Sequence, residues 1–227
     1  MLKNRIKHFI GRFPSIFVPF YKLVGPGRNQ KLLYGDDTEL VIEGFPRSAN
    51  TFAVVAFEQA QSRPVKSAHH LHVEAQLVKA ALDNKPAVAL IRNPEDCFRS
   101  LLIRHPRTPV MWAVNRYIHF YTAVEKLGDK CLVVTYEDVT KDMGAVIRRI
   151  NSRFNTDYDV PVHDDEMVKK VFKEVESINK SLDQGKESHV ARPSNERKVL
   201  AEKIDFTNYE KEIDCANKLY EALINKT

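Results

Sequence analysis

Residues 44–51 read Gly-Phe-Pro-Arg-Ser-Ala-Asn-Thr and lie between an apolar run and a helical pattern. The run before them, Leu-Val-Ile at 40–42, is typical of a buried strand, and Phe-Ala-Val-Val-Ala-Phe at 52–57 begins a helix. A loop that connects a strand to a helix in this way directs backbone N–H groups and the positive end of the helix dipole toward one point. The stretch therefore predicts an anion-binding site at the start of a helix.

The loop differs in two places from the phosphate-binding pattern G-x-x-x-x-G-K-[ST], although Gly44 and Thr51 keep their register. Ala49 stands where the pattern has its second glycine, and Asn50 stands where it has lysine. Enzymes that use ATP or GTP send that lysine to the β- and γ-phosphates. Because the cation of this loop is Arg47, we expect a phosphate-bearing donor that is not an ordinary triphosphate.

The composition is that of a globular protein with one substantial core. The chain has 227 residues, of which 43% are hydrophobic and 29% are charged. Its three cysteines, Cys97, Cys131 and Cys215, are too scattered for a disulfide framework or a zinc site. They favour a reducing compartment, so we expect a cytoplasmic protein.

The net charge of +5 arises at one end of the chain. Residues 1–35 contain seven Lys or Arg and no acidic residue, whereas the remainder contains 28 basic and 30 acidic residues. A nucleic-acid-binding domain would carry its basic excess on the folded body. We therefore expect no nucleic-acid partner.

Residues 1–34 are predicted to form a basic, apolar N-terminal arm that precedes a domain at 35–227. Pro14 and Pro19 interrupt the arm, and no apolar run approaches the ~20 residues that span a bilayer. Arg12 likewise divides the apolar region that a signal peptide would need. Two interpretations remain. We favour a strap that packs on the domain over an interfacial segment that makes the protein peripheral at an anionic membrane surface.

Apolar runs and helical patterns alternate along the rest of the chain. The predicted strands are at 64–69, 87–91 and 132–136, and the predicted helices are at 73–82, from 94 onward, and at 110–127, 140–154, 165–179 and 209–225, with a loop at 181–195. This alternation predicts an α/β protein. We expect a three-layer α/β/α fold, P-loop NTPase-like, with a central parallel sheet of about four to five strands.

Several polar residues fall at the carboxyl ends of the predicted strands, where folds of this class bind their ligands. These residues are Arg47, His69, His70, Arg92 and Tyr136. Ser100 follows Arg92 by eight residues, about two turns into the next helix. A guanidinium group and a hydroxyl group at this spacing can bracket one phosphate.

Four segments, in this order, resemble those of the sulfotransferases that use 3′-phosphoadenosine 5′-phosphosulfate (PAPS). Residues 45–52 look like their 5′-phosphosulfate loop, [FY]-P-[KR]-S-G-[TN]-T-[WF], and residues 91–96 with Ser100 look like their 3′-phosphate motif, R-[ND]-P-x-D with a later serine. Residues 134–138 are similar to the family's Y-E-D strand end, whose tyrosine lies near the adenine. Residues 192–198 resemble the C-terminal basic loop that closes over the 3′-phosphate.

The resemblance covers most of the chain and implies roles for individual residues. The donor would be bound by Arg47, Ser48, Ala49, Asn50, Thr51, Phe52, Arg92, Ser100 and Tyr136, and by residues among Arg192, Ser194, Arg197 and Lys198. The last four stay open because no clear R-K-G is present, and Ala49 replaces the family's glycine.

Catalysis would involve Arg47, Lys66 and a histidine at the end of the second strand. The family's second strand ends K-[TS]-H, and counting from Lys66 favours His69 as the base. Aligning the pair His70-Leu71 with the family's H-L favours His70 instead. An imidazole titrates near neutral pH, so either could take the acceptor proton as a general base.

The sequence thus predicts an enzyme that moves a sulfonate to a hydroxyl or amine of a small-molecule, glycan or lipid acceptor, releasing the 3′,5′-bisphosphate (PAP). The resemblance implies no metal. Trp112, Asn115, Arg116 and Tyr117 are candidates for the acceptor pocket, although aromatic residues at helical spacing are more often core.

The sequence leaves two alternative functions. The first is a P-loop-type nucleotide kinase, which the missing lysine opposes. The second is a non-catalytic nucleotide-binding module, which the histidines at the second strand end oppose.

Overall fold

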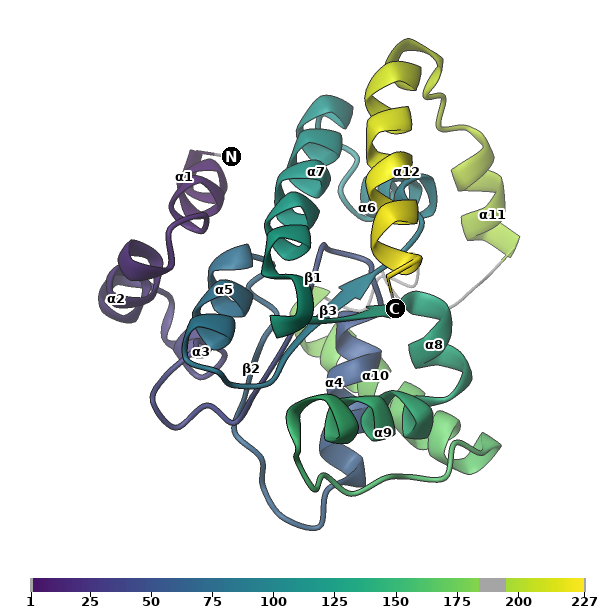
Figure 1. The fold of residues 1–227 in the computed structure, drawn as a ribbon. Helices are drawn as coiled ribbons and strands as arrows, with labels where there is room; N and C mark the ends of the chain where they lie inside the picture. The colour runs from purple at the N-terminus through teal and green to yellow at the C-terminus, as the bar shows by residue number, and fades with distance from the viewer. Residues whose placement is uncertain (1, 184–194, 227) are drawn as a thin grey trace.

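The computed structural model describes residues 2–183 and 195–226, and it has a parallel sheet at its centre (Figure 1). The sheet has four strands in the order β2-β1-β3-β4. Their bounds are β1 Leu40–Gly44, β2 Ser67–His69, β3 Ala87–Ile91 and β4 Leu132–Thr135. All three pairings are parallel, so the carboxyl ends of the four strands lie at one edge. The predicted α/β class with helices on both faces of a parallel sheet is confirmed.

Twelve α-helices are found in the described residues. Their bounds are α1 Leu2–Ile10, α2 Pro14–Val24, α3 Gly27–Gln30, α4 Asn50–Ala60, α5 Glu74–Leu82, α6 Pro94–Arg104, α7 Val110–Leu127, α8 Tyr136–Lys141, α9 Met143–Phe154, α10 Asp165–Asp183, α11 Asn195–Glu202 and α12 Glu210–Ile224. Short 3₁₀ segments occupy η1 Gly128–Lys130 and η3 Thr207–Tyr209.

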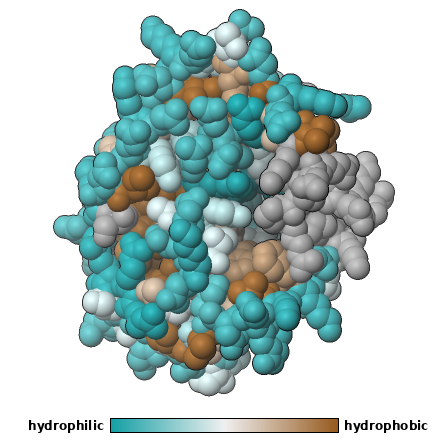
Figure 2. All heavy atoms as spheres, turned by 90° about the vertical axis from the view of Figure 1, so that its right-hand side faces the viewer, coloured by the Kyte–Doolittle hydropathy of each residue, from teal (hydrophilic) through white to brown (hydrophobic). Residues whose placement is uncertain are grey.

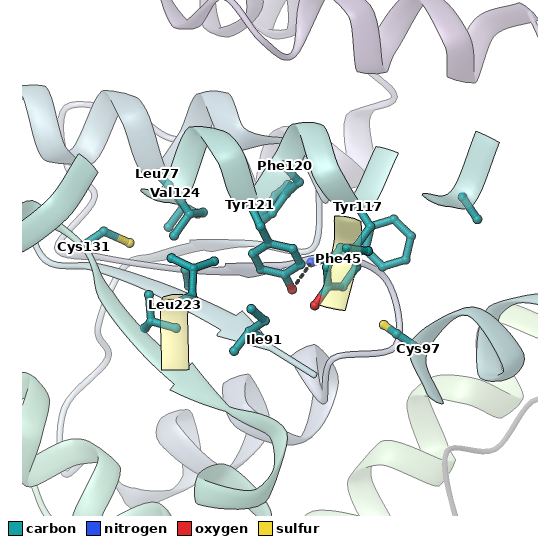
Figure 3. Close-up of a cluster of buried hydrophobic side chains, with 14 of the residues drawn as sticks. Phe45, Leu77, Ile91, Cys97, Tyr117, Phe120, Tyr121, Val124, Cys131 and Leu223 are labelled. Carbon is teal, nitrogen blue, oxygen red and sulfur yellow. Dashed lines mark hydrogen bonds between the residues drawn. The ribbon is translucent and has the colours of Figure 1, made fainter. Parts of the chain in front are cut away.

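Alternate residues of the strands face two separate hydrophobic clusters. On β1, Val41 packs in the cluster that includes α5, α6, α7 and α12, which Figure 3 shows in part. Its neighbours Leu40 and Ile42 pack in the second cluster, with α4, α9 and α10. Because both faces of the sheet are covered, the central strand β3 is apolar along its length, which explains its unbroken Ala-Val-Ala-Leu-Ile run.

The predicted start of α6 is confirmed at the atomic level. The side chain of Asn93 accepts a hydrogen bond from the backbone N–H of Asp96, and Pro94 occupies the first turn. Helix α7 and strand β3 also have the predicted bounds.

The single helix predicted at 140–154 was wrong, because the chain forms α8 and α9 instead. The Asp142 side chain accepts a hydrogen bond from Ala145 N at 2.8 Å and caps α9. Tyr136, predicted to end a strand, begins α8, since Thr135 and Asp138 form a capping box around the helix start. Strand β2 is likewise shorter than the predicted 64–69.

Part of the N-terminal arm packs on the body of the protein. Phe17 and Tyr21 of α2 are buried in a third cluster with Leu71, Val73 and Ala75. Across the parts of the chain that the structure describes, no helix has the length and apolar character needed to cross a bilayer.

Replacing Gly44 by alanine is expected to destabilise the fold by about 1–3 kcal/mol. A Cβ atom at Gly44 would lie 2.5 Å from the carbonyl oxygen of Leu90 in the neighbouring strand, so β1 and β3 would have to separate locally. Chemical denaturation measures the change in unfolding free energy. The matched control is Gly27→Ala, where an added Cβ meets nothing within 4 Å. Equal unfolding free energies for the Gly44→Ala and Gly27→Ala variants would contradict the close approach of β1 and β3.

Candidate functional site

The sheet brings four chain segments to one edge. Strand β1 lies between β2 and β3, so the loop after Gly44 is flanked by the segments that begin at His70 and Arg92, with Tyr136 beyond. The β3 arrow of Figure 1 points toward the side that Figure 2 faces, where the described residues near the centre are mostly hydrophilic or neutral. The expected clustering of polar residues at the strand ends therefore defines the candidate site.

The loop between β1 and α4 has an uncommon backbone conformation. Arg47 has a φ of 79° and Ala49 has a φ of 66°. Both values lie in the left-handed region, which residues other than glycine rarely adopt. Such positions cost of order 1–3 kcal/mol each and cluster at functional sites. Ala49 immediately precedes α4, and it provides no side-chain cap for the helix. The first N–H groups of α4 thus keep their capacity to bind an anion.

Contacts with the core hold this loop in place (Figure 3). The Tyr121 hydroxyl group donates to the carbonyl oxygen of Leu90 at 2.6 Å and accepts from the N–H of Phe45 at 3.3 Å. The buried Ser48 hydroxyl oxygen lies 3.3 Å from the Tyr121 hydroxyl oxygen and 3.6 Å from Cys97 Sγ. The Ser48 side chain therefore faces the core and not the open side of the loop, so its backbone N–H is the group it can offer to a ligand.

The Asn50 side chain is also used within the loop. Its Nδ2 donates to the carbonyl oxygen of Phe45 at 3.0 Å. Asn50 therefore does not act as the missing lysine would, and it supports the turn from the inside.

Two arginines meet beside the loop. Arg47 Nε donates to Ser100 Oγ at 2.9 Å, and Arg92 Nη1 lies 3.4 Å from the Arg47 carbonyl oxygen. The Arg92 guanidinium carbon lies 4.3 Å from the centre of the Tyr136 ring. Four residues that were predicted from three separate motifs, Arg47, Arg92, Ser100 and Tyr136, are thus linked by contacts.

Arg92 has unused hydrogen-bonding capacity. In the described residues, Arg92 Nε and Asn50 Oδ1 are the buried side-chain atoms that lack a hydrogen-bond partner. The contact of Arg92 with Asp96 is long, at 3.8 Å. An unpaired buried guanidinium nitrogen is costly, so this arginine is suited to an anionic ligand.

On the other side of the loop, two histidines connect the loop to Glu58. His70 Nε2 lies 3.1 Å from Thr51 Oγ1, and the Nδ1 atoms of His70 and His69 are 2.6 Å apart. His69 Nε2 lies 3.8 Å from Glu58 Oε1. A hydrogen bond between two Nδ1 atoms holds one proton, so one ring donates to the other.

Burial keeps both of these rings neutral. It lowers the pKa of His69 to about 3, with smaller contributions from the charges of His70 and Lys66. It also lowers the pKa of His70 to about 4. At ordinary pH both rings are unprotonated and can accept a proton, but their lowered pKa values make them weaker bases than the near-neutral imidazole expected from the sequence.

A buried carboxylate organises the segment that follows these histidines. Glu43 accepts hydrogen bonds from Leu71 N at 2.7 Å, His72 N at 3.0 Å and Gln76 Nε2 at 2.8 Å. Burial raises the pKa of Glu43 to about 7. His72 Nδ1 donates to the Gly44 carbonyl oxygen at 2.9 Å, so its role is to join two strand ends.

The sequence reasoning did not identify Tyr121 and Glu43 as site residues. Tyr121 follows Tyr117 by one helical turn, which looks like an ordinary core stripe. Glu43 had a visible signal, because a charged residue directly follows the apolar run of a buried strand.

The side chains of two other predicted residues, Lys66 and Phe52, make contacts elsewhere. Lys66 precedes β2, at the opposite end of the strand from His69, and its Nζ donates to the Lys31 carbonyl oxygen. The structure therefore does not bring Lys66 into the site. Phe52 packs its ring against Phe172 of α10, with the ring centres 5.4 Å apart.

The C-terminal candidates are not placed by the structure. Arg192 and Ser194 lie outside the described residues. Arg197 and Lys198 lie on α11, and their side chains are likewise outside the description.

Two of the acceptor-pocket candidates, Arg116 and Tyr117, form contacts that hold the fold together. Arg116 forms a buried ion pair with Glu74 and donates to the His72 carbonyl oxygen at 3.0 Å. Tyr117 is buried in the core, and its hydroxyl group donates to the Arg92 carbonyl oxygen at 2.8 Å. Among the described residues, no group of three or more His, Cys, Asp or Glu is arranged to hold a metal ion.

No protein-family model and no curated protein matches this sequence. The function is therefore inferred from the motifs and from the geometry of their residues.

The unfolding free energy is expected to rise between about pH 4.5 and 6.5. The buried histidines bind protons less readily than in the unfolded chain, where their pKa is near 6.5, so acid favours unfolding by up to about 1.4 kcal/mol per pH unit for each. Burial also lowers the pKa of His8, to about 2, and the pKa of His119, so both add to this rise. Glu43, whose pKa burial raises to about 7, and Glu58, whose pKa burial also raises, act in the opposite direction, but they are two groups against five histidines.

Urea denaturation at a series of pH values measures this dependence. A His69→Gln variant should show a shallower rise than the parent protein. A parent stability that is flat or falls from pH 4.5 to 6.5 would be inconsistent with neutral buried histidines.

Proposed function

We propose that this protein is a sulfotransferase that moves a sulfonate from PAPS to a hydroxyl or amine acceptor. One observation carries the proposal. Arg47 of the loop and Arg92 beside it lie in contact, and the neutral His70 contacts Thr51 in the first turn of α4. Sulfonyl transfer needs cationic groups for the donor phosphates and a base for the acceptor, and both stand beside this loop.

The arginine side supports binding of the nucleotide part of the donor. Arg92 has an unpaired buried Nε. Its Nη1 contacts the carbonyl oxygen of Arg47, and the Arg47 side chain in turn contacts Ser100. A phosphate that accepts hydrogen bonds from Arg92 and Ser100 would satisfy that nitrogen. The N–H groups at the start of α4 would receive the 5′-phosphosulfate.

The histidine side supports His70 as the general base. If Glu58 attracts the N–H of His69 Nε2, His69 Nδ1 accepts the proton of His70 Nδ1, which leaves the lone pair of His70 on Nε2. His70 Nε2 contacts Thr51 in the first turn of α4, whereas His69 contacts the other ring nitrogen of His70. We therefore assign His70 as the base and His69 as a positioning residue.

The proposed reaction is a single displacement at the sulfur atom. The acceptor oxygen or nitrogen forms a bond to sulfur while its proton passes to His70 Nε2. The bond between sulfur and the bridging oxygen breaks, and its electron pair stays on the bisphosphate. The N–H groups of α4 stabilise the charge that develops there. The Thr51 hydroxyl group can donate to the same oxygen once the acceptor has replaced it as the partner of His70 Nε2.

Replacing Arg92 by alanine is expected to weaken PAP binding about 10- to 100-fold, since a hydrogen bond to a charged group is worth about 1.5–3 kcal/mol. Isothermal titration calorimetry measures the affinity. Arg148→Ala is the matched control, because Arg148 is exposed and pairs with Asp142 in the capping region of α9. Unchanged affinity in the Arg92 variant would remove this arginine from the nucleotide site.

Replacing His70 by alanine is expected to slow transfer about 10²- to 10⁴-fold while PAP affinity stays within about twofold. His69→Ala should slow transfer less and shift its pH profile, because it acts only through His70. Single-turnover assays with donor labelled in its sulfonate, over a panel of sugars, lipids, alcohols and tyrosine peptides, give the rates.

Two other outcomes would contradict the sulfotransferase proposal and favour a different function. Tighter binding of ATP with Mg²⁺ than of PAP would favour a kinase. Tight PAP binding with no transfer to any acceptor, and no release of labelled sulfate, would favour a non-catalytic module.

A further inference from the structure

Large apolar side chains gather on the outer side of the N-terminal arm. Leu23 is 83% exposed and Phe9 is 61% exposed. We call the whole set the outer apolar face; its members are Ile6, Phe9, Phe13, Ile16, Phe20, Leu23 and Val24. In the described residues, only four other large hydrophobic side chains have comparable exposure, so the clustering is specific to the arm.

Helix α2 has two apolar stripes. Phe17 and Tyr21, one turn apart, are buried against the body of the protein. Ile16, Phe20 and Leu23 follow the spacing of another helical face and are exposed. A helix that served only as a strap would carry polar residues on this second face, so packing on the domain does not explain it.

The face continues from α2 to α1. The rings of Phe9 and Phe13 are in contact, with their centres 5.9 Å apart. Figure 1 shows both helices at the left margin of the molecule, on the side away from α11 and α12. The patch is therefore formed by two helices and the turn between them.

The arm that carries this face is rich in basic residues and contains no acidic residue, although Lys7 is turned toward the body, where burial lowers its pKa. Residues 1–35 contain seven Lys or Arg and no Asp or Glu. Arg12, Lys22 and Lys31 are exposed among those whose side chains are described. A second copy of this arm would bring like charges together without a partner of opposite sign, which disfavours a symmetric dimer through this face.

We propose that α1 and α2 dock on an anionic lipid bilayer. The outer apolar face enters the boundary between headgroups and acyl chains, and the basic residues contact the lipid phosphates. Phe17 and Tyr21 keep the arm attached to the body, so docking needs no unfolding of the core. The proposal is independent of the reaction at the strand ends.

Flotation of the full chain with lipid vesicles tests the proposal without any nucleotide. Binding to vesicles of 70% phosphatidylcholine and 30% phosphatidylserine is expected to be at least ~10-fold stronger than to pure phosphatidylcholine, and to weaken as salt is added. A Phe9→Ser/Phe20→Ser variant should lose at least ~10-fold in binding.

A matched control separates this effect from general loss of surface hydrophobicity. Val162→Ser changes an apolar residue that is more exposed than Phe9 or Phe20, at 77%, in the segment between α9 and α10, and it should bind like the parent. Circular dichroism melting checks that each variant is folded.

Two results would overturn the proposal. The first is equal or absent binding to both kinds of vesicle. The second is a concentration-dependent dimer, measured by light scattering without lipid, that the Phe9→Ser/Phe20→Ser variant abolishes, because a second copy would then cover the face.

Discussion

The Tyr121 hydroxyl group joins the loop of the candidate site to the sheet and to α7. It donates to Leu90 of β3 and accepts from Phe45 at the start of the loop. It also contacts Ser48, two residues before the first turn of α4. Because one buried group contacts all of these, the direction in which the loop N–H groups point follows from the packing of the core. The arginines and histidines depend on this geometry, since both sides of the site contact loop residues.

The site contains several features that usually destabilise a folded protein. Arg47 and Ala49 hold positive φ values, Arg92 keeps a buried nitrogen unpaired, and Glu43 is a carboxylate without exposure to water. Two of these are offset locally: the loop by Tyr121 and Asn50, and Glu43 by three donors. Arg92 Nε has no such partner among the described residues. Such an arrangement is typical of a preorganised site and is not expected of a surface turn.

Much of the fold was predictable because strongly periodic segments carry their own signal. The unbroken apolar run of β3 and the stripe of α7 gave correct bounds, and Asn93 marked the start of α6. The start of α8 was missed although its signal is local, since Thr135 and Asp138 have capping-box spacing. Lys66 was misplaced because a count along the chain does not show that β2 separates it from His69. The bonds of Glu43 to Gln76 and of Tyr121 to Phe45 connect residues far apart in sequence, which periodicity cannot detect.

The central claim is that one nucleotide is held by two anion sites, one at the start of α4 and one at Arg92 and Ser100. Calorimetric titration of the full chain with adenosine 3′,5′-bisphosphate and with adenosine 5′-monophosphate tests it most directly, because the two ligands differ only in the 3′-phosphate. The account predicts at least ~10-fold tighter binding of the bisphosphate. Equal affinities would contradict it.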